Sequence, residues 1–191
     1  STGAGSYTVA ENGLYTAEAW ETFMARLEPD GIFTVSRWYH TVSPGETARM
    51  LALAMEVLYR RGVADPRAHI VLLQNLNVST LLVSPTPYSE ADLDHMQAEV
   101  KRLGYTTLAT PRRAPSVALL AGVWSQRDRE SLWTWCGEQD LDLTPPTDER
   151  PFWYRPSSSM ETWVPWGRSH STSLLTSTRG SFFAVSITIS T

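Results

Sequence analysis

The stretch LYTAEAWETFMARLEPDGIFTVSRW, residues Leu14–Trp38, decides the predicted fold. Four of its large apolar residues recur at the spacing that places side chains on one face of a helix: Trp20, Phe23, Met24 and Leu27. Thr16 is the predicted N-cap, and Glu18 follows in the first turn, where the helix dipole favours an anion. After a break at residues 29–31, the β-branched and aromatic run 32–35 predicts a strand. A helix that leads directly into a strand is the repeating unit of an open α/β sheet.

The rest of the chain continues this pattern of helices and strands. A helix is predicted from Ser43-Pro44-Gly45-Glu46, as N-cap, first turn and capping box, to the stop at Gly62. The apolar runs 70–73 and 80–83 are too close for a crossover helix and therefore predict an antiparallel hairpin. Three further elements are expected: a helix from Ser89 to Gly104, a strand over 105–109, and a helix over 117–138 that is broken near Gly122–Ser125. Residues 141–150 read as an extended connector.

The chain divides into two regions of different character. Residues 1–155 have the composition of a globular domain, whereas nearly half of the residues in the 156–191 region are Ser or Thr. Only a short run at 182–189 predicts a strand there. Three interpretations of this tail stay open: disorder, a small β attachment, or a translation that has left its reading frame.

Composition narrows the classes of function. The 191 residues are 42% hydrophobic and 19% charged with a net charge of −4, which favours a globular protein and gives no support for a nucleic-acid surface. The single cysteine, Cys136, lies in an aromatic run, where a packed thiol is favoured over a nucleophile. No apolar run approaches the roughly 20 residues needed to span a bilayer, so we expect this segment to make no membrane contact. The four histidines lack metal-ligand spacing, and no metal site is predicted.

Several local patterns could carry chemistry. The run Gly3-Ala4-Gly5 has no preceding strand, so a plain loop is favoured over a phosphate-binding loop. The run Glu11-Asn12-Gly13-Leu14-Tyr15-Thr16 offers a carboxylate, an amide and a phenol, and both a pocket wall and a simple helix cap stay open. His40 follows Arg37-Trp38-Tyr39 at the carboxyl end of the strand, where open α/β sheets bind ligands, but a surface histidine is the favoured interpretation. For the charges of 147–152, an ion-paired anchor for the connector is favoured.

Five runs of residues, in this order, resemble the spermidine-synthase-like family, aminopropyltransferase relatives on the class I S-adenosylmethionine-dependent methyltransferase fold. The resemblance covers about residues 1–154, and Glu149 stands where the family has the second acid of its TDDRPF run. The matching runs are TGAGS at 2–6, ENGLYTAEAW at 11–20, LEPDGI at 27–32, RWY at 37–39 and PPTDERPF at 145–152.

The resemblance implies the C-terminal half of a Rossmann-like α/β sheet with an antiparallel hairpin, followed by an irregular tail. The chain would begin just after the fourth strand, and residues 32–37 would form the fifth. The cofactor-binding loop and the catalytic aspartate would lie upstream, so no catalytic residue is assigned. The implied wall of the substrate and cofactor pocket consists of Thr2, Gly3, Ala4, Glu11, Asn12, Tyr15, Trp38 and Tyr39.

The implied activity belongs to polyamine biosynthesis: transfer of an aminopropyl or other alkyl group from the sulfonium of S-adenosylmethionine, or of its decarboxylated form, to a small amine. A small-molecule methyltransferase and a non-catalytic nucleoside-binding or scaffold domain are the alternatives. For this segment alone we expect no cofactor binding and no turnover. The resemblance further implies a cytoplasmic domain and a parent that can be attached to the inner membrane by helices outside this segment. From the net charge we expect no nucleic-acid partner, and a homodimer is left open as one alternative.

Overall fold

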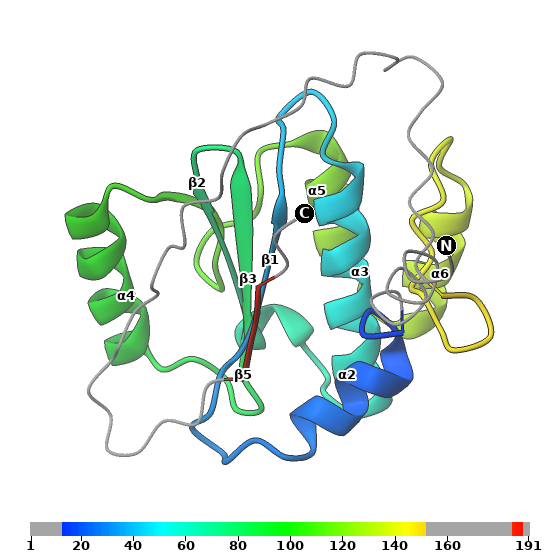
Figure 1. Cartoon of the computed structure of the whole chain (residues 1–191), viewed down its shortest axis with the longest axis horizontal. Helices are drawn as coiled ribbons and strands as arrows, with labels where there is room; N and C mark the ends of the chain where they lie inside the picture. Colours follow the sequence, from blue (N-terminus) through cyan, green and yellow to red (C-terminus); the bar gives the residue numbers. More distant parts are fainter. Residues whose placement is uncertain (1–12, 152–184, 189–191) are drawn as a thin grey trace, which may run out of the picture.

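A computed structural model describes residues 13–151 and the backbone of residues 185–188. Within these ranges the chain is a mixed α/β structure (Figure 1). The helices are α2 (Ala17–Met24), α3 (Gly45–Arg60), α4 (Glu90–Leu103), α5 (Ala118–Trp124) and α6 (Arg129–Gly137), with a 3-10 helix at Pro66–His69. The strands are β1 (Phe33–Trp38), β2 (Ile70–Asn75), β3 (Val78–Val83), β4 (Thr106–Ala109) and β5 (Val185–Thr188).

The sheet has the strand order β4-β2-β3-β1-β5. All three pairs among β1 to β4 are antiparallel, and β5 pairs with β1 in parallel. Because β3 is antiparallel to both of its neighbours, β1 and β2 run in the same direction on either side of it. The hairpin predicted from runs 70–73 and 80–83 is thus confirmed, and its second strand lies in the interior of the sheet.

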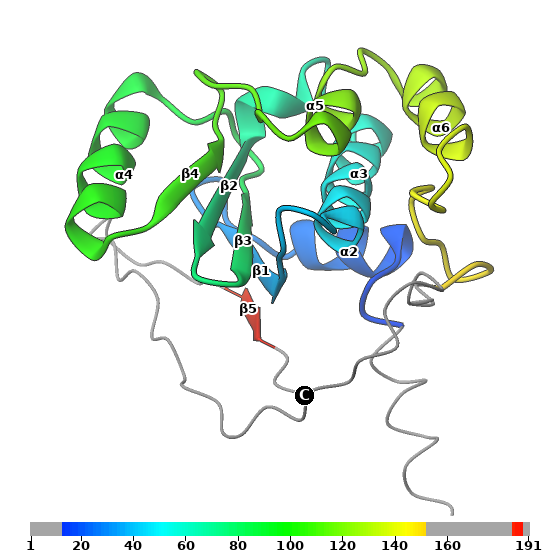
Figure 2. The ribbon, with the colours of Figure 1, turned by 90° about the horizontal axis from the view of Figure 1, so that it is seen from above.

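Helices cover both faces of the sheet (Figure 2). One core lies between the sheet and helices α2, α3, α5 and α6, and a smaller one lies under α4. Successive residues of β2 alternate between them: Ile70 and Leu72 face the larger core, whereas Val71 and Leu73 face the smaller one. A strand buried on both faces has no polar side, which explains the unbroken apolar run IVLL.

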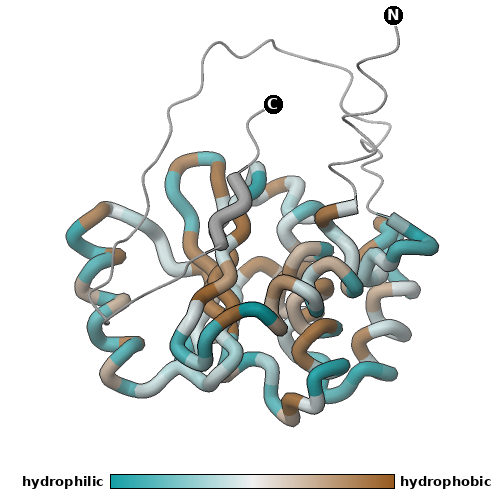
Figure 3. The backbone as a smooth tube through the Cα atoms, turned by 60° about the horizontal axis from the view of Figure 1, so that its bottom comes forward, coloured by the Kyte–Doolittle hydropathy of each residue, from teal (hydrophilic) through white to brown (hydrophobic). Residues whose placement is uncertain are grey.

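Helix α3 is the centre of the larger core. Every residue from Thr47 to Leu58 is buried, because the sheet and three other helices surround this segment. Apolar segments accordingly gather on α3 and the strands (Figure 3). The sequence predicts only a stripe at residues 50, 53, 54, 57 and 58, so tertiary packing covers much more of this helix than its amphipathic face.

Most predicted helix ends are confirmed. The Thr16 side chain accepts a hydrogen bond from the Ala19 N–H at 3.2 Å, and Ser89 forms a capping box with Asp92. Gly62 and Gly104 adopt φ values of 81° and 72°, left-handed conformations that end α3 and α4 at little cost to glycine. The break between α5 and α6 falls slightly later than predicted, from Ser125 to Asp128.

The predicted start of α3 is wrong. Pro44, rather than Ser43, is the N-cap residue, and no side chain caps the helix. Glu46 does not complete a capping box, because its carboxylate pairs with Arg37 at the end of β1. The Glu46 carboxylate thus accepts a charge-assisted hydrogen bond from Arg37 of β1 in place of the predicted bond within the capping box.

Gly122 is required by the packing of α5 against α6. A Cβ at this position would lie 2.0 Å from Cζ2 of Trp135. We therefore expect Gly122→Ala to displace the indole and to lower the free energy of unfolding by about 1–3 kcal/mol, even though alanine favours a helix by about 1 kcal/mol over glycine. Urea unfolding followed by circular dichroism measures this change.

Gly137→Ala is the matched control, because a Cβ at 137 would meet no atom within 4 Å. The double variant Gly122→Ala/Trp135→Ala removes the indole that the new Cβ would meet. The changes in the free energy of unfolding caused by the two substitutions should therefore be strongly non-additive. An unchanged unfolding midpoint for Gly122→Ala would contradict the close α5–α6 contact.

Candidate functional site

The carboxyl end of β1 brings together several of the residues predicted to form the pocket. The guanidinium carbon of Arg37 lies 4.7 Å from the ring centroid of Tyr15, a cation–π geometry. The same guanidinium pairs with the Glu46 carboxylate from the first turn of α3, and both of these side chains are mostly buried. Strand β1, helix α3 and the residue before the N-cap of α2 therefore meet at one point.

The two residues after Arg37, Trp38 and Tyr39, differ in their exposure to solvent. Trp38 is 56% exposed, so its indole face is open to a ligand. Tyr39 is only 2% exposed, and its backbone N–H donates to the Asn77 carbonyl at 2.8 Å. The Tyr39 hydroxyl oxygen is buried with no hydrogen-bond partner among the described residues. Burial also raises the pKa of this phenol above its ordinary value, so it stays protonated at neutral pH.

The three described residues of the predicted pocket wall differ in accessibility. Trp38 is accessible, whereas Tyr15 and Tyr39 are core residues that a ligand cannot reach without a side-chain movement. The guanidinium of Arg37 already lies over the Tyr15 ring. The other five residues, Thr2, Gly3, Ala4, Glu11 and Asn12, lie outside the described residues.

The connector after α6 is attached to the start of α2. The Ala17 N–H donates to the Pro146 carbonyl at 2.9 Å, and the Asp148 N–H donates to the Glu18 carboxylate at 3.0 Å. Burial opposes ionisation of Glu18, but hydrogen bonds from Arg60 and from backbone N–H groups outweigh it and lower the pKa of this carboxyl. Backbone hydrogen bonds, rather than the predicted ion pair, therefore attach the described part of the connector to α2, because Arg150 pairs with Asp142 inside the connector itself. Residue 152 lies outside the described residues.

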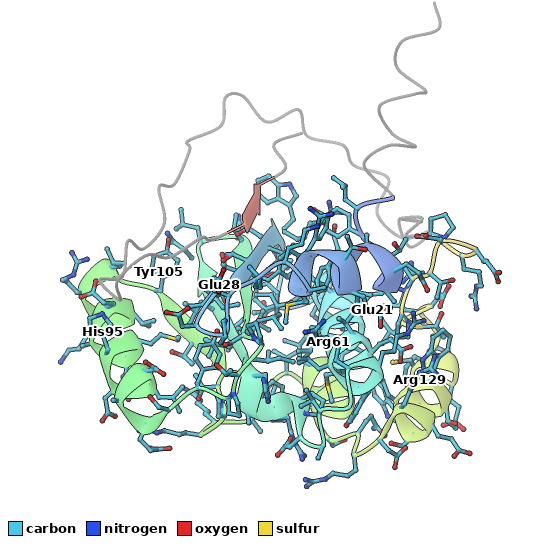
Figure 4. All side chains as sticks on the ribbon, turned by 90° about the horizontal axis from the view of Figure 1, so that it is seen from below. Glu21, Glu28, Arg61, His95, Tyr105 and Arg129 are labelled. Atoms are coloured by element: carbon cyan, nitrogen blue, oxygen red, sulfur yellow. The ribbon has the colours of Figure 1, made fainter. Side chains whose placement is uncertain are left out.

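A buried carboxylate that the sequence did not single out lies in the helical layer. Glu56 of α3 is 0% exposed and accepts hydrogen bonds from Arg60, Arg129 and Trp133 at 2.6 to 3.0 Å. Arg60 also pairs with Glu18 and Glu21 of α2. Figure 4 labels Glu21, on α2, and Arg129, on α6, in this helical layer. The available signal was a lone acid inside the apolar run MLALAMEVL at 50–58.

The remaining titratable candidates have structural surroundings. The Cys136 thiol is buried, and burial, followed by the charge of Asp142, raises its pKa to about 12, so it carries no thiolate at neutral pH. His69 is buried with Nδ1 3.0 Å from the Ser84 carbonyl oxygen, whereas His40 is exposed. No group of three His, Cys, Asp or Glu residues that could hold a metal ion occurs in the described ranges.

Two cavities of the described chain lie away from the end of β1. One, of about 400 Å³, is lined by residues of α6 and the turn before it, including Asp128, Glu130 and Trp135. The other, of about 320 Å³, is lined by Arg67, Arg112, Arg113 and Arg127 among others.

Helices long and apolar enough to cross a membrane do not occur in the part of the chain that the structure describes. No protein-family model, curated protein or solved structure matched this chain when compared with it.

Proposed function

We propose that this chain is part of a transferase domain that moves an alkyl group, aminopropyl in the first instance, from a sulfonium centre to an amine. The observation that carries the proposal is the strand order: the second strand of the β2–β3 hairpin is inserted between β1 and β2, which run in the same direction. The resemblance implies the class I S-adenosylmethionine-dependent fold, in which an antiparallel hairpin follows the strand that corresponds to β1. In α/β sheets ligands bind beyond the carboxyl ends of strands, and Arg37, Trp38 and Tyr39 occupy that end of β1.

The described residues fit the amine side of such a reaction better than the cofactor side. Trp38 offers an exposed indole face, which attracts an ammonium group electrostatically. Glu46 cannot serve as a free base, because Arg37 holds its carboxylate. No glycine-rich loop following a strand occurs among the described residues, so we assign no step to the cofactor itself. Trp38 would bind and orient the acceptor, which contributes to rate by positioning.

The reaction is tested with the protein expressed from its complete gene. Incubation with decarboxylated S-adenosylmethionine and putrescine should release methylthioadenosine, which chromatography with mass spectrometry detects. Release of S-adenosylhomocysteine from S-adenosylmethionine would instead favour the methyltransferase alternative. If neither product forms with any amine acceptor, the transferase proposal is wrong and the non-catalytic alternative remains.

Replacing Trp38 tests the role of this residue. We expect Trp38→Ala to raise the KM for the diamine by about 3- to 30-fold, the range of a cation–π contact, with a smaller effect on kcat. Trp38→Phe should recover part of the lost affinity, because it keeps a π face. The exposed position of Trp38 means that the fold should be retained. Equal KM values for all three proteins would remove Trp38 from the acceptor site.

A further inference from the structure

We infer that the chain has a second binding site, for a dianionic phosphate group, at the end of the sheet opposite to Arg37 and Trp38. The site is the cavity of about 320 Å³ formed by the 3-10 helix before β2, the turn after β4 and the end of α5. Because β4 is antiparallel to β2, the last residues of β4 and the first residues of β2 lie at the same end of the sheet. Its charged and aromatic lining residues are Asp65, Arg67, Arg112, Arg113, Trp124 and Arg127.

Two of the four arginines are held by neighbouring acids. Arg67 Nε donates to Asp65 at 2.5 Å, and Arg112 pairs with Glu90 and with Asp94. These pairs fix the two guanidinium groups and supply carboxylates that balance their charge. Arg67 and Arg112 therefore line the cavity with guanidinium groups that are already paired with acids.

The other two arginines, Arg113 and Arg127, are exposed side chains that no described acid holds in an ion pair. Neither Arg113 nor Arg127 has an ion pair with an acid in residues 13–151. Arg127 lies close enough for its charge to contribute, after the hydrogen bonds from Arg67, to lowering the pKa of Asp65. An anion in the cavity would complete this charge balance, and the planar guanidinium fork suits a phosphate oxygen pair.

Local hydrogen bonds restrain the backbone that carries Arg113 and Arg127. Thr110 and Arg113 exchange two backbone hydrogen bonds of 2.9 Å across Pro111 and Arg112, which closes a tight turn. On the facing segment, the Arg127 N–H is 3.3 Å from Ser131 Oγ at the start of α6. Binding would therefore order the two exposed side chains but not the backbone that carries them.

The surroundings favour a small anion over an extended one. Acids border the arginines at Asp65, Glu90, Asp94 and Asp128, and the chain as a whole has a net charge of −4. A nucleic acid or a long acidic peptide would meet all of these carboxylates, whereas a single phosphate group in the cavity would meet only Asp65, which Arg67 already holds. The ligand is therefore free phosphate or a small phosphate ester.

Titration of the full chain with sodium phosphate tests the site. We expect saturable shifts in the NMR signals of the Arg113 and Arg127 Nε–H groups and of the Trp124 indole N–H. Sodium chloride at matched ionic strength should not reproduce these shifts, because screening alone has no saturable site. A parallel titration with glycerol 3-phosphate distinguishes the sources: tighter binding than phosphate indicates an ester, and equal binding indicates the free ion.

The double variant Arg113→Gln/Arg127→Gln should raise the apparent Kd for phosphate at least about tenfold, since two charge-assisted contacts are removed. Arg26→Gln is the control, because it removes the same type of charge from an exposed position after α2. Circular dichroism and the unfolding midpoint confirm that each variant folds. The inference is overturned if chloride gives the same shifts, if the double variant binds phosphate as the parent does, or if an oligonucleotide binds here far more tightly than phosphate.

Discussion

Glu56→Ala is expected to lower the free energy of unfolding by about 3–5 kcal/mol, the cost of breaking a buried ionic network from one side. The Glu56 carboxylate is completely buried and receives hydrogen bonds from Arg60, Arg129 and Trp133. Removing it leaves a cavity beside α3 and leaves the Trp133 indole N–H without its acceptor. Arg129 is largely exposed and can turn to water, and Arg60 keeps Glu18 and Glu21, so we place the loss near the lower end of this range.

Urea unfolding of three proteins measures this effect. Glu56→Gln keeps a side-chain oxygen for the hydrogen bonds but removes the charge, so it should be less destabilising than Glu56→Ala. Glu99→Ala, which breaks an exposed pair with Arg102 on α4, should leave the midpoint almost unchanged. A midpoint for Glu56→Ala equal to that of the Glu99 variant would show that the network adds no stability.

Phe33→Ala is expected to cost about 3–5 kcal/mol, as is usual for removal of a buried aromatic ring. The Phe33 ring is fully buried and lies between β1 and α2. Its centroid is 4.8 Å from that of Trp20 with an interplanar angle of 72°, and 5.8 Å from that of Phe23. These edge and tilted contacts join the helix to the strand. Loss of the ring should also speed amide hydrogen exchange in α2 more than in α4.

Trp38→Ala is the matched control, because Trp38 lies in the same strand but is more than half exposed. We expect its unfolding midpoint to stay close to that of the parent, within about 0.5 kcal/mol. Equal destabilisation by the Phe33 and Trp38 variants would contradict the claim that the buried Phe33 ring holds α2 against β1. Uniform acceleration of exchange in all helices would instead show that the fold opens as one unit.

Local features of the fold could be predicted because their causes are local. The caps at Thr16 and Ser89, the glycine stops at 62 and 104 and the short link between the hairpin strands each depend on residues within a few positions of one another. The start of α3 was mispredicted for the opposite reason: Glu46 has a charged partner, Arg37, that lies on another element. Sequence spacing does not reveal which of two partners a carboxylate will choose.

The candidate sites likewise combine features that the sequence indicates locally with features that only tertiary packing decides. Residue type suggested Tyr15, Trp38 and Tyr39 as pocket residues, but only packing decided that both phenols are buried and that the indole is exposed. The arginines of the second cavity could not be grouped from the sequence, since residues 67, 113 and 127 come from three separate segments. Neither could Glu56, whose partners include residues more than 70 positions away.

The sequence by itself determined the α/β character, the order and ends of most elements and the hairpin, because hydrophobic periodicity and caps act over one or two turns. Only the tertiary structure decided the insertion of β3 between β1 and β2, the burial of α3 on all sides and the pairing of Arg37 with Glu46. These features depend on which surfaces exclude water together and on which charges meet there. Both conditions join residues far apart in the chain, and a linear pattern does not contain them.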